Sequence, residues 1–195
     1  MDKQNLFKLE EQFNETMATL NLRGCPLYLQ TLLFMKKEYA IDCLEREKIE
    51  KTPDTLLMLS PVIPKNYMGL YGLILLVSFN FAKAEISLNP NELTNSVETP
   101  DSPYFIFDIR KAKKKPSPKY RYLTVEETLA IVIQDPDILN DYTIKILNSL
   151  YQKKHRLFLY NKKVDSSQIY PVPTIGTSPP SEKEIICPIC RTITI

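Results

Sequence analysis

The spacing of apolar residues changes once along the chain, and this change limits the fold more than any other feature. Near the N-terminus, Phe13, Met17 and Leu20 recur at three- and four-residue steps, the period of an amphipathic helix. "RGC" breaks this run, and Pro26 then suits the first turn of a second helix. Later apolar runs are short and bounded by Pro, Asn and Asp, which is typical of strands. A helical pair followed by strands predicts an α+β protein.

The change falls in the charged stretch "EREKIEKTPD", Glu45–Asp54, which is the best candidate for a boundary. It separates an N-terminal helical segment, residues 1–50, from an α+β domain, residues 55–195. The whole chain has 195 residues, of which 44% are hydrophobic, enough to bury one core. We therefore expect the helical segment to pack on the domain as one compact unit.

The domain is expected to hold a mixed or antiparallel sheet of about five short strands. Four apolar runs have the length and residue types of strands: Thr55–Pro64, Leu73–Phe79, Tyr104–Ile109 and Arg156–Tyr160. The final "ITI" fits an added edge strand, and the Pro- and Ser-rich stretch Asp165–Glu184 fits a surface loop or extended arm.

Two helices are expected on one face of this sheet. Thr124 and Glu127 have the spacing of a capping box, and Pro136 ends the helix that this box begins. A second helix is predicted over Asp137–Tyr151. Four residues at four-residue steps would form its buried side: Ile138, Tyr142, Ile146 and Leu150.

The order of these features resembles an uncharacterised family of bacterial proteins of similar length. The resemblance covers Leu56–Tyr160 and lies in "VIPKNYMGL", "ISLNPNEL", "PDSPYFIFDI" and "LTVEETLAIVIQDPDIL", an L-T-x-x-E-x-x-A helix followed by P-x-x-L. Members tend to carry Trp near the C-terminus, whereas this chain has no Trp and ends in "CPICRTITI". The family is a domain of unknown function, so the resemblance implies a fold and no reaction.

Composition excludes several classes of function. Lys and Arg number 25 against 23 Asp and Glu, so the net charge of +2 gives no overall attraction to nucleic acid or membranes. With 4 glycines, a phosphate-binding glycine loop is not expected. The longest apolar stretch, Met68–Ala82, is shorter than the ~20 residues of a membrane span, and we interpret it as a buried strand. The N-terminus lacks the pattern of a secretory signal, which predicts a cytoplasmic protein with reduced thiols.

The C-x-x-C formed by Cys187 and Cys190 is the most recognisable chemical motif. Two thiolates at this spacing can bind one Zn²⁺, but a structural site needs four ligands. The remaining candidates are His155, Cys25 and Cys43, which the fold would have to bring to the motif. Zinc is therefore the cofactor to test, and otherwise the cofactor is unknown. Thiol redox chemistry is a second interpretation, although the β-branched "RTITI" disfavours the helix it requires. The third is a terminal strand with two incidental thiols.

The segment Arg110–Tyr122 is strongly basic, with two tyrosines that could stack on bases. Its positive residues are Arg110, Lys111, Lys113, Lys114, Lys115, Lys119 and Arg121. We favour a solvated loop between a strand and a helix, because runs of charge are usually exposed to solvent. If the segment binds nucleic acid, the affinity will fall steeply with salt, and charge reversal of the three central lysines will remove it.

Other candidate groups carry less chemistry. His155, the only histidine, is flanked by Lys154 and Arg156 and has no evident carboxylate partner in sequence. Asp108 lies on an otherwise apolar and aromatic strand and is the acid to inspect for burial.

The leading hypothesis is a non-enzymatic binding or interaction protein. It would use a surface near the basic segment or the Pro-rich arm to bind an unidentified protein or small molecule, and no membrane. A zinc-binding protein and a nucleic-acid-binding protein are the alternatives.

Overall fold

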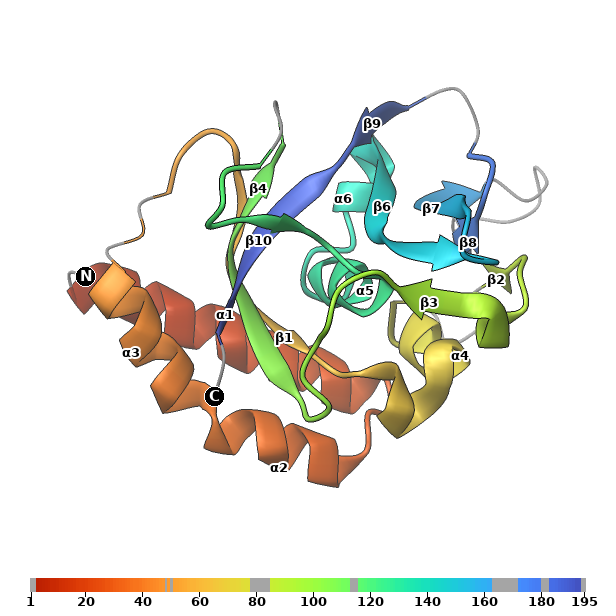
Figure 1. Cartoon of the computed structure of the whole chain (residues 1–195). Coiled ribbons are helices and arrows are strands. Elements are labelled where there is room, and N and C mark those ends of the chain that lie inside the picture. The colour runs from red at the N-terminus through yellow and green to blue at the C-terminus, as the bar shows by residue number, and fades with distance from the viewer. Residues whose placement is uncertain are drawn as a thin grey trace.

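The structure is a computed structural model that describes residues 3–47, 49, 51–77, 85–112, 116–162, 172–179 and 183–193. The predicted α+β fold is confirmed (Figure 1). The helices are α1 Lys3–Leu22, α2 Leu27–Met35, α3 Lys37–Glu47, α4 Lys65–Val77, α5 Val125–Gln134, α6 Ile138–Asp141 and a 3-10 turn η1, Pro90–Glu92. The strands are β1 Thr55–Val62, β2 Glu85–Ile86, β3 Leu93–Asn95, β4 Tyr104–Lys111, β5 Arg121–Tyr122, β6 Tyr142–Tyr151, β7 His155–Lys162, β8 Val172–Gly176, β9 Glu184–Ile186 and β10 Pro188–Ile193.

The described strands form two sheets rather than one. The first has the order β1-β4-β10-β5, and all of its pairs are antiparallel. The second has the order β2-β8-β7-β6-β3, and β9 joins it as a parallel partner of β6. Because β9 and β10 are separated by Cys187 alone, the chain passes from the second sheet to the first at this residue.

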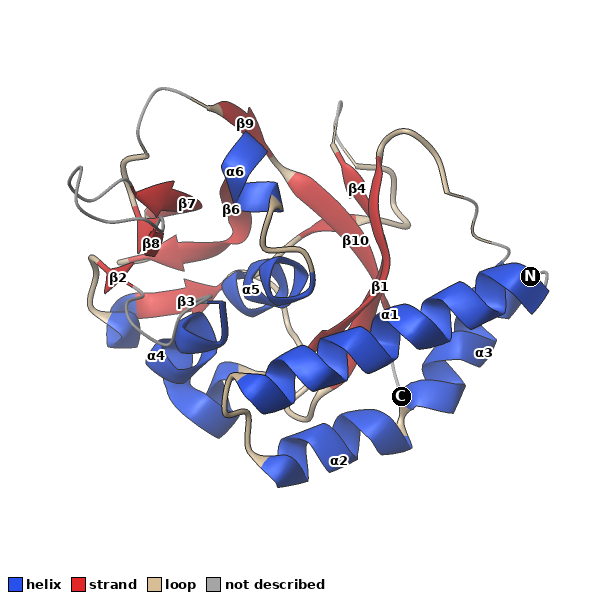
Figure 2. Ribbon diagram, turned by 180° about the vertical axis from the view of Figure 1, so that it is seen from behind, coloured by secondary structure: helices blue, strands red, loops and turns tan. Residues whose placement is uncertain are grey.

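Helix α5 lies between the two sheets and is the centre of the core (Figures 1 and 2). Every residue from Val125 to Ile133 is buried, and the helix contacts α1, α4, β1 and β6. Its predicted capping box is confirmed, since the Thr124 side chain accepts from the Glu127 amide while the Glu127 side chain accepts from the Thr124 amide. The capping box therefore fixes the start of the helix, with Thr124 as its N-cap.

The N-terminal helices lie mainly on the side of the first sheet away from α5. On β4, Tyr104 points to Glu127 of α5, whereas the ring of the next residue, Phe105, lies 6.1 Å from that of Phe13 on α1, measured between centroids. Helix α1 contacts β1 and α5 and buries Leu9, Phe13 and Leu20 in a core cluster continuous with that of the sheets. The second helix expected in this region divides at Lys36 into α2 and α3. The predicted helical segment is thus present, with one more break than the sequence suggested.

Two predicted elements are wrong. The stretch Met68–Ala82, expected as a strand, is helical as far as Val77, and the rest of the predicted strand, residues 78–82, lies outside the described residues. The helix expected over Asp137–Tyr151 is helical only at Ile138–Asp141, and strand β6 follows. Some of their apolar residues, such as Leu73 and Ile146, are buried, but in the other type of secondary structure, while Tyr71 and Leu75 are exposed.

The C-terminal region also differs from expectation. Of the predicted edge strand "ITI", the structure describes Ile193 alone, which ends β10 and pairs with Phe105 of β4, while residues 194–195 lie outside the described residues. Strand β5 pairs with β10 at Ile189 and Cys190. Part of the stretch expected as a surface arm is the buried strand β8, while residues 163–171 and 180–182 lie outside the described residues. The strands predicted around β1, β4 and β7 are confirmed. None of the described helices has the length and apolar character needed to cross a membrane.

Candidate interaction surface

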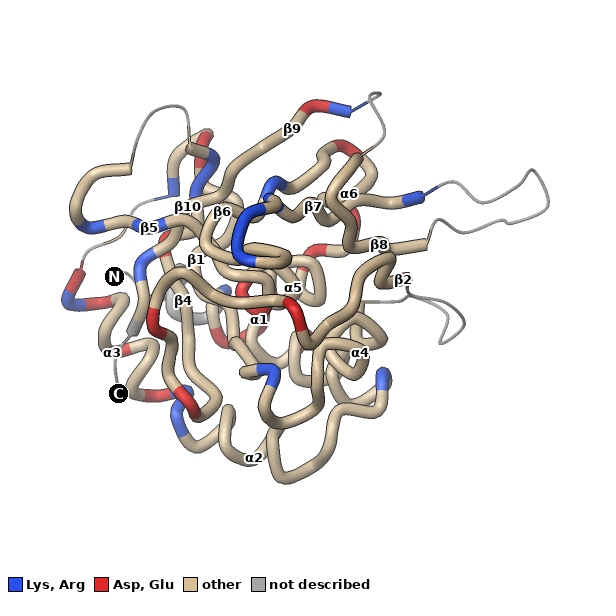
Figure 3. The backbone as a smooth tube through the Cα atoms, turned by 45° about the vertical axis from the view of Figure 1, so that its right-hand side comes forward, with Lys and Arg blue, Asp and Glu red and all other residues tan. Residues whose placement is uncertain are grey.

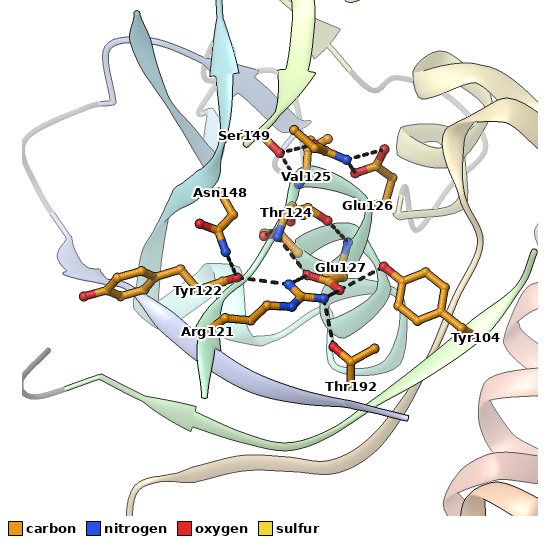
Figure 4. Close-up of polar contacts among 12 residues, drawn as sticks. Tyr104, Arg121, Tyr122, Thr124, Val125, Glu126, Glu127, Asn148, Ser149 and Thr192 are labelled. Atoms are coloured by element: carbon orange, nitrogen blue, oxygen red, sulfur yellow. Dashed lines mark hydrogen bonds and ion pairs between the residues drawn. The ribbon is translucent and has the colours of Figure 1, made fainter. Parts of the chain in front are cut away.

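The most extensive buried polar cluster centres on the carboxylate of Glu127, which is fully buried at the start of α5 (Figure 4). The hydroxyl of Tyr104 donates to Oε1 at 2.8 Å, and the Thr124 amide donates to Oε2 at 2.9 Å. The guanidinium of Arg121 donates to both oxygens, through Nη1 at 2.7 Å and through Nη2. Four donors thus surround one carboxylate, which compensates its loss of water.

The same cluster holds its cation in place. Arg121 Nη2 also donates to Thr192 Oγ1 at 2.8 Å, which joins β5 to β10 through side chains. Burial alone lowers the pKa of Arg121, but the hydrogen bond and charge of Glu127 raise it above its ordinary value. Burial, followed by Glu127, raises the pKa of Tyr104. At neutral pH both groups therefore keep their protons and act as donors.

A second polar chain runs beside the first one. Asn95 donates to Glu126 at 3.0 Å and accepts from Ser149 Oγ at 2.6 Å. Ser149 in turn accepts from the Val125 amide at 2.8 Å. These bonds tie β3 and β6 to the first turn of α5. Both acidic residues at this helix end are thereby occupied by neighbours within the chain.

Asp108 is the second buried acid with charged partners. Asp108, the acid that the sequence singled out to inspect for burial, is 2% exposed. Its carboxylate accepts hydrogen bonds from Arg110 Nε and from the Tyr120 hydroxyl. Its φ of 48° is unusual for a residue other than glycine. Strand β10 pairs with β4 on both sides of this point with a register shift, which leaves Asp108 in a bulge opposite Cys190. The bulge turns the carboxylate toward its two partners.

These contacts account for much of the basic segment. Arg110 and Arg121 each bind a buried acid of the same chain, and Lys111 donates to the Tyr142 hydroxyl with its Nζ 4.0 Å from the ring centroid. Lys119 is exposed. The other three positive residues predicted to contact anions lie outside the described residues: Lys113, Lys114 and Lys115. Three of the seven predicted anion contacts therefore have partners inside the protein.

The structure places Cys187 and Cys190 on extended backbone at the passage from β9 into β10. Residues three apart in an extended strand are roughly 10 Å apart, unlike two ligands on a tight turn. Cys190 is fully buried, and burial followed by Glu127 raises its pKa. Cys25 is buried near the start of α2 and His155 is exposed on β7. Within the described ranges, no three His, Cys, Asp or Glu side chains form a group that could hold a metal.

A small cavity lies where α1, β1, α4 and α5 meet. Thr16, Leu20, Leu73 and Glu126 are among the residues that line it. Its volume is about 10 Å³, room for about one water molecule. A small-molecule substrate does not fit in this cavity, which is far below the size of a ligand pocket.

Helix α2 carries a surface that sequence reasoning missed. Four of its large apolar side chains are strongly exposed: Leu27 at 75%, Tyr28 at 54%, Phe34 at 60% and Met35 at 75%. Tyr28, Phe34 and Met35 follow Leu27 by one, seven and eight residues, and this spacing places all four on one face of the helix. The opposite face buries Leu29 and Leu33 completely. We call Leu27, Tyr28, Phe34 and Met35, with Thr31 between them, the α2 face.

The α2 face is held from beneath. The ring of Phe34 lies 6.3 Å from that of Phe13, and the ring of Tyr28 lies 6.4 Å from that of Tyr67, measured between centroids. At the start of the helix, Gln30 donates to the Cys25 carbonyl at 2.7 Å. Just beyond its end, Lys36 donates to the Pro103 carbonyl at 2.8 Å. The exposed aromatic rings are therefore presented by a fixed helix.

The signal for this surface was present in the sequence. "LYLQTLLFM" is apolar on all sides, so whichever face packs inward, apolar side chains stay outside. Such a helix is normally covered, either by the rest of its own protein or by a partner.

No family model matches the chain, and comparisons with the curated proteins and with the solved structures found no significant match. The candidate surface accordingly has to be judged on its own physical chemistry.

Proposed function

We propose that this protein is a non-enzymatic interaction protein that binds another protein through the α2 face. The observation that carries the proposal is the exposure of Leu27, Tyr28, Phe34 and Met35 on one side of an uncharged helix. Contiguous exposed apolar side chains of this size mark interaction sites on soluble proteins. Tyr and Phe anchors that are already fixed in place lose little conformational entropy on binding.

The buried ionic groups support a binding role over catalysis. Glu127 has four donors and Asp108 has two, all from this chain, so neither carboxylate is poised toward a ligand. The cavity beside Glu126 is about one water in size. These arrangements stabilise the fold, whereas α2 exposes four large apolar side chains, more than any other described element.

The proposal can be tested in the producing cells by site-specific photo-crosslinking. Phe34 is replaced by the photoreactive amino acid p-benzoylphenylalanine, cells are irradiated, and adducts of the chain are resolved by denaturing electrophoresis. We expect one discrete adduct from position 34, because the ring is 60% exposed on the proposed surface. The same replacement at Ile185, which is 50% exposed on β9, is the control and should give none.

A second substitution makes the result specific. Adding Leu27→Ser to the chain that is photoreactive at position 34 should abolish the adduct, since Leu27 lies seven residues, about two turns, before Phe34 on the same face. If position 34 yields no more adduct than position 185, or if Leu27→Ser leaves the adduct unchanged, the α2 face is not a binding surface.

A further inference from the structure

We propose that the partner of the α2 face is a second copy of this chain, bound across a two-fold axis that passes beside Thr31. This inference rests on the proposed function, and it names the partner and the geometry. The two helices would lie antiparallel, each presenting the same residues to the other, as in an isologous dimer.

The spacing of the exposed residues supports a two-fold arrangement. The exposed apolar residues are placed symmetrically about Thr31. Leu27 and Met35 lie four residues before and after it, and Tyr28 and Phe34 lie three residues before and after it. In an antiparallel pair centred on Thr31, Leu27 meets the partner's Met35 and Tyr28 meets the partner's Phe34. Every large exposed side chain of the face then packs against another one, and none is left facing water.

Thr31 suits the centre of such a pair. It is small, so two helices can approach to the roughly 8–10 Å between axes that close packing requires. Its hydroxyl donates to the Leu27 carbonyl at 3.0 Å within the same helix. Burying Thr31 therefore leaves no unpaired hydroxyl hydrogen, which would otherwise oppose association.

Charge also favours a second copy over a membrane surface. Helix α2 contains no Asp, Glu, Lys or Arg from Leu27 to Met35, so self-pairing brings no like charges together (Figure 3). The lysines that follow are already used: Lys36 donates to Ser102 and Pro103, and Lys37 pairs with Glu10 at 3.6 Å. A helix that binds anionic lipid needs free basic residues beside its apolar face.

The area available is sufficient for a dimer. At roughly 200 Å² for a large, fully exposed side chain, exposures of 75%, 54%, 60% and 75% amount to roughly 500 Å² per chain. Two chains would then bury roughly 1,000 Å² through these residues alone, the size at which specific interfaces begin. Leu22, 72% exposed at the end of α1, and Tyr39, 44% exposed on α3, are further exposed apolar side chains on the helices that precede and follow α2.

The first experiment is sedimentation equilibrium of the purified full chain. We expect a mass of twice 22.6 kDa at high micromolar concentration, dissociating on dilution. Phe34→Ser should weaken the dimer about thirtyfold, the loss typical of an interface anchor, without changing the circular dichroism spectrum. Ile185→Ser is the matched control, and its dimer should be unchanged.

Disulfide trapping tests the axis itself. Thr31→Cys places two thiols at the crossing point, so mild oxidation should join two chains. In Met35→Cys the thiols lie eight residues apart along the antiparallel pair, roughly 12 Å, and should not join. The unmodified chain, with its own four cysteines, is the blank.

The outcomes are distinguishable from those of the proposed function. A purified chain that stays monomeric at several hundred micromolar overturns the inference, as does Met35→Cys joining faster than Thr31→Cys. If the chain is monomeric while photoreactive position 34 still gives an adduct of another mass in cells, the proposed function stands and the partner is a different protein. Binding of the monomer to anionic vesicles through Phe34 would overturn both.

Discussion

The start of α5 and the face of α2 invert the usual distribution of residues in opposite ways. At α5, the charged side chain of Glu127 is fully buried, whereas on α2 Leu27 and Met35 are each 75% exposed. The first inversion is resolved inside the chain, because Tyr104, Thr124 and Arg121 supply donors for the buried carboxylate. The second has no such resolution among the described residues. A buried charged group whose hydrogen-bond partners lie in the same chain has a structural role. An exposed apolar face with no cover in the same chain indicates a binding partner.

Glu127→Ala should have the largest effect on stability. It leaves Arg121 and Tyr104 buried without their acceptor and removes half of the capping box, so the free energy of unfolding should fall by about 3–5 kcal/mol. Urea denaturation measures this change. The control is Glu85→Ala, which breaks the exposed pair with Lys162 and should cost less than about 1 kcal/mol. Equal losses in both variants would mean that the buried cluster does not hold the fold together.

Substitutions on the two faces of α2 should have different effects on the free energy of unfolding, measured by the same urea denaturation. Leu33→Ala, on the fully buried side, should lower the free energy of unfolding by about 2–5 kcal/mol. Met35→Ala, two residues on, should change it by no more than about 0.5 kcal/mol, provided that the protein is dilute enough to be monomeric. A large loss in Met35→Ala under those conditions would show that the α2 face is packed within its own chain.

Thr31→Glu should leave the folded monomer almost unchanged, within about 0.5 kcal/mol, because the side chain is exposed. It should nevertheless abolish self-association, since the two-fold axis places two like charges side by side. Sedimentation velocity measures the association. Ile185→Glu adds the same charge on another exposed apolar residue and should have no effect. If Thr31→Glu still forms dimers, the two-fold axis of the dimer does not lie on α2.

Thiol labelling sharpens the comparison without altering stability. Burial raises the pKa of Cys25 to about 11, so at pH 8 roughly one thiol in a thousand is ionised. Because the folded protein holds this proton more tightly than the unfolded chain, the free energy of unfolding should also fall as pH rises from about 9 to about 11.

In the labelling experiment, half-buried Cys43 should react with iodoacetamide well before Cys25, as mass spectrometry of the labelled peptides can show. Equal labelling would mean that the α1–α2 turn opens in solution.

The sequence predicted the parts of the fold in which one local pattern had one interpretation. The capping box at Thr124 and Glu127 is such a case, because it needs only two residues three apart. The predicted helix over Asp137–Tyr151 is the opposite case. Ile138, Tyr142, Ile146 and Leu150 repeat every four residues, which fits one face of a helix and equally one face of a strand. Pairing with β7 decided between them, and no local pattern carries that information.

The candidate sites show the same limit. Burial of Asp108 was suggested by its apolar neighbours in sequence, but its contacts with Arg110 and Tyr120 require the bulge between β4 and β10. Arg121 was considered for nucleic acid because nothing local showed that β5 would bring it to Glu127. The α2 face was missed for another reason. Apolar residues on all sides of a helix do not reveal which side the fold will leave outside.

The most direct test of the central claim is the oxidation of Met35 by hydroxyl radicals, followed by mass spectrometry, at a series of protein concentrations. Met35 is 75% exposed in the single chain, whereas Met58 and Met68 are half-buried and serve as internal references. The account predicts that Met35 reacts fastest in dilute protein and becomes protected as the concentration rises, while the ratio of Met58 to Met68 stays constant. Oxidation of Met35 that is equally fast at every concentration would contradict a self-associating α2 face.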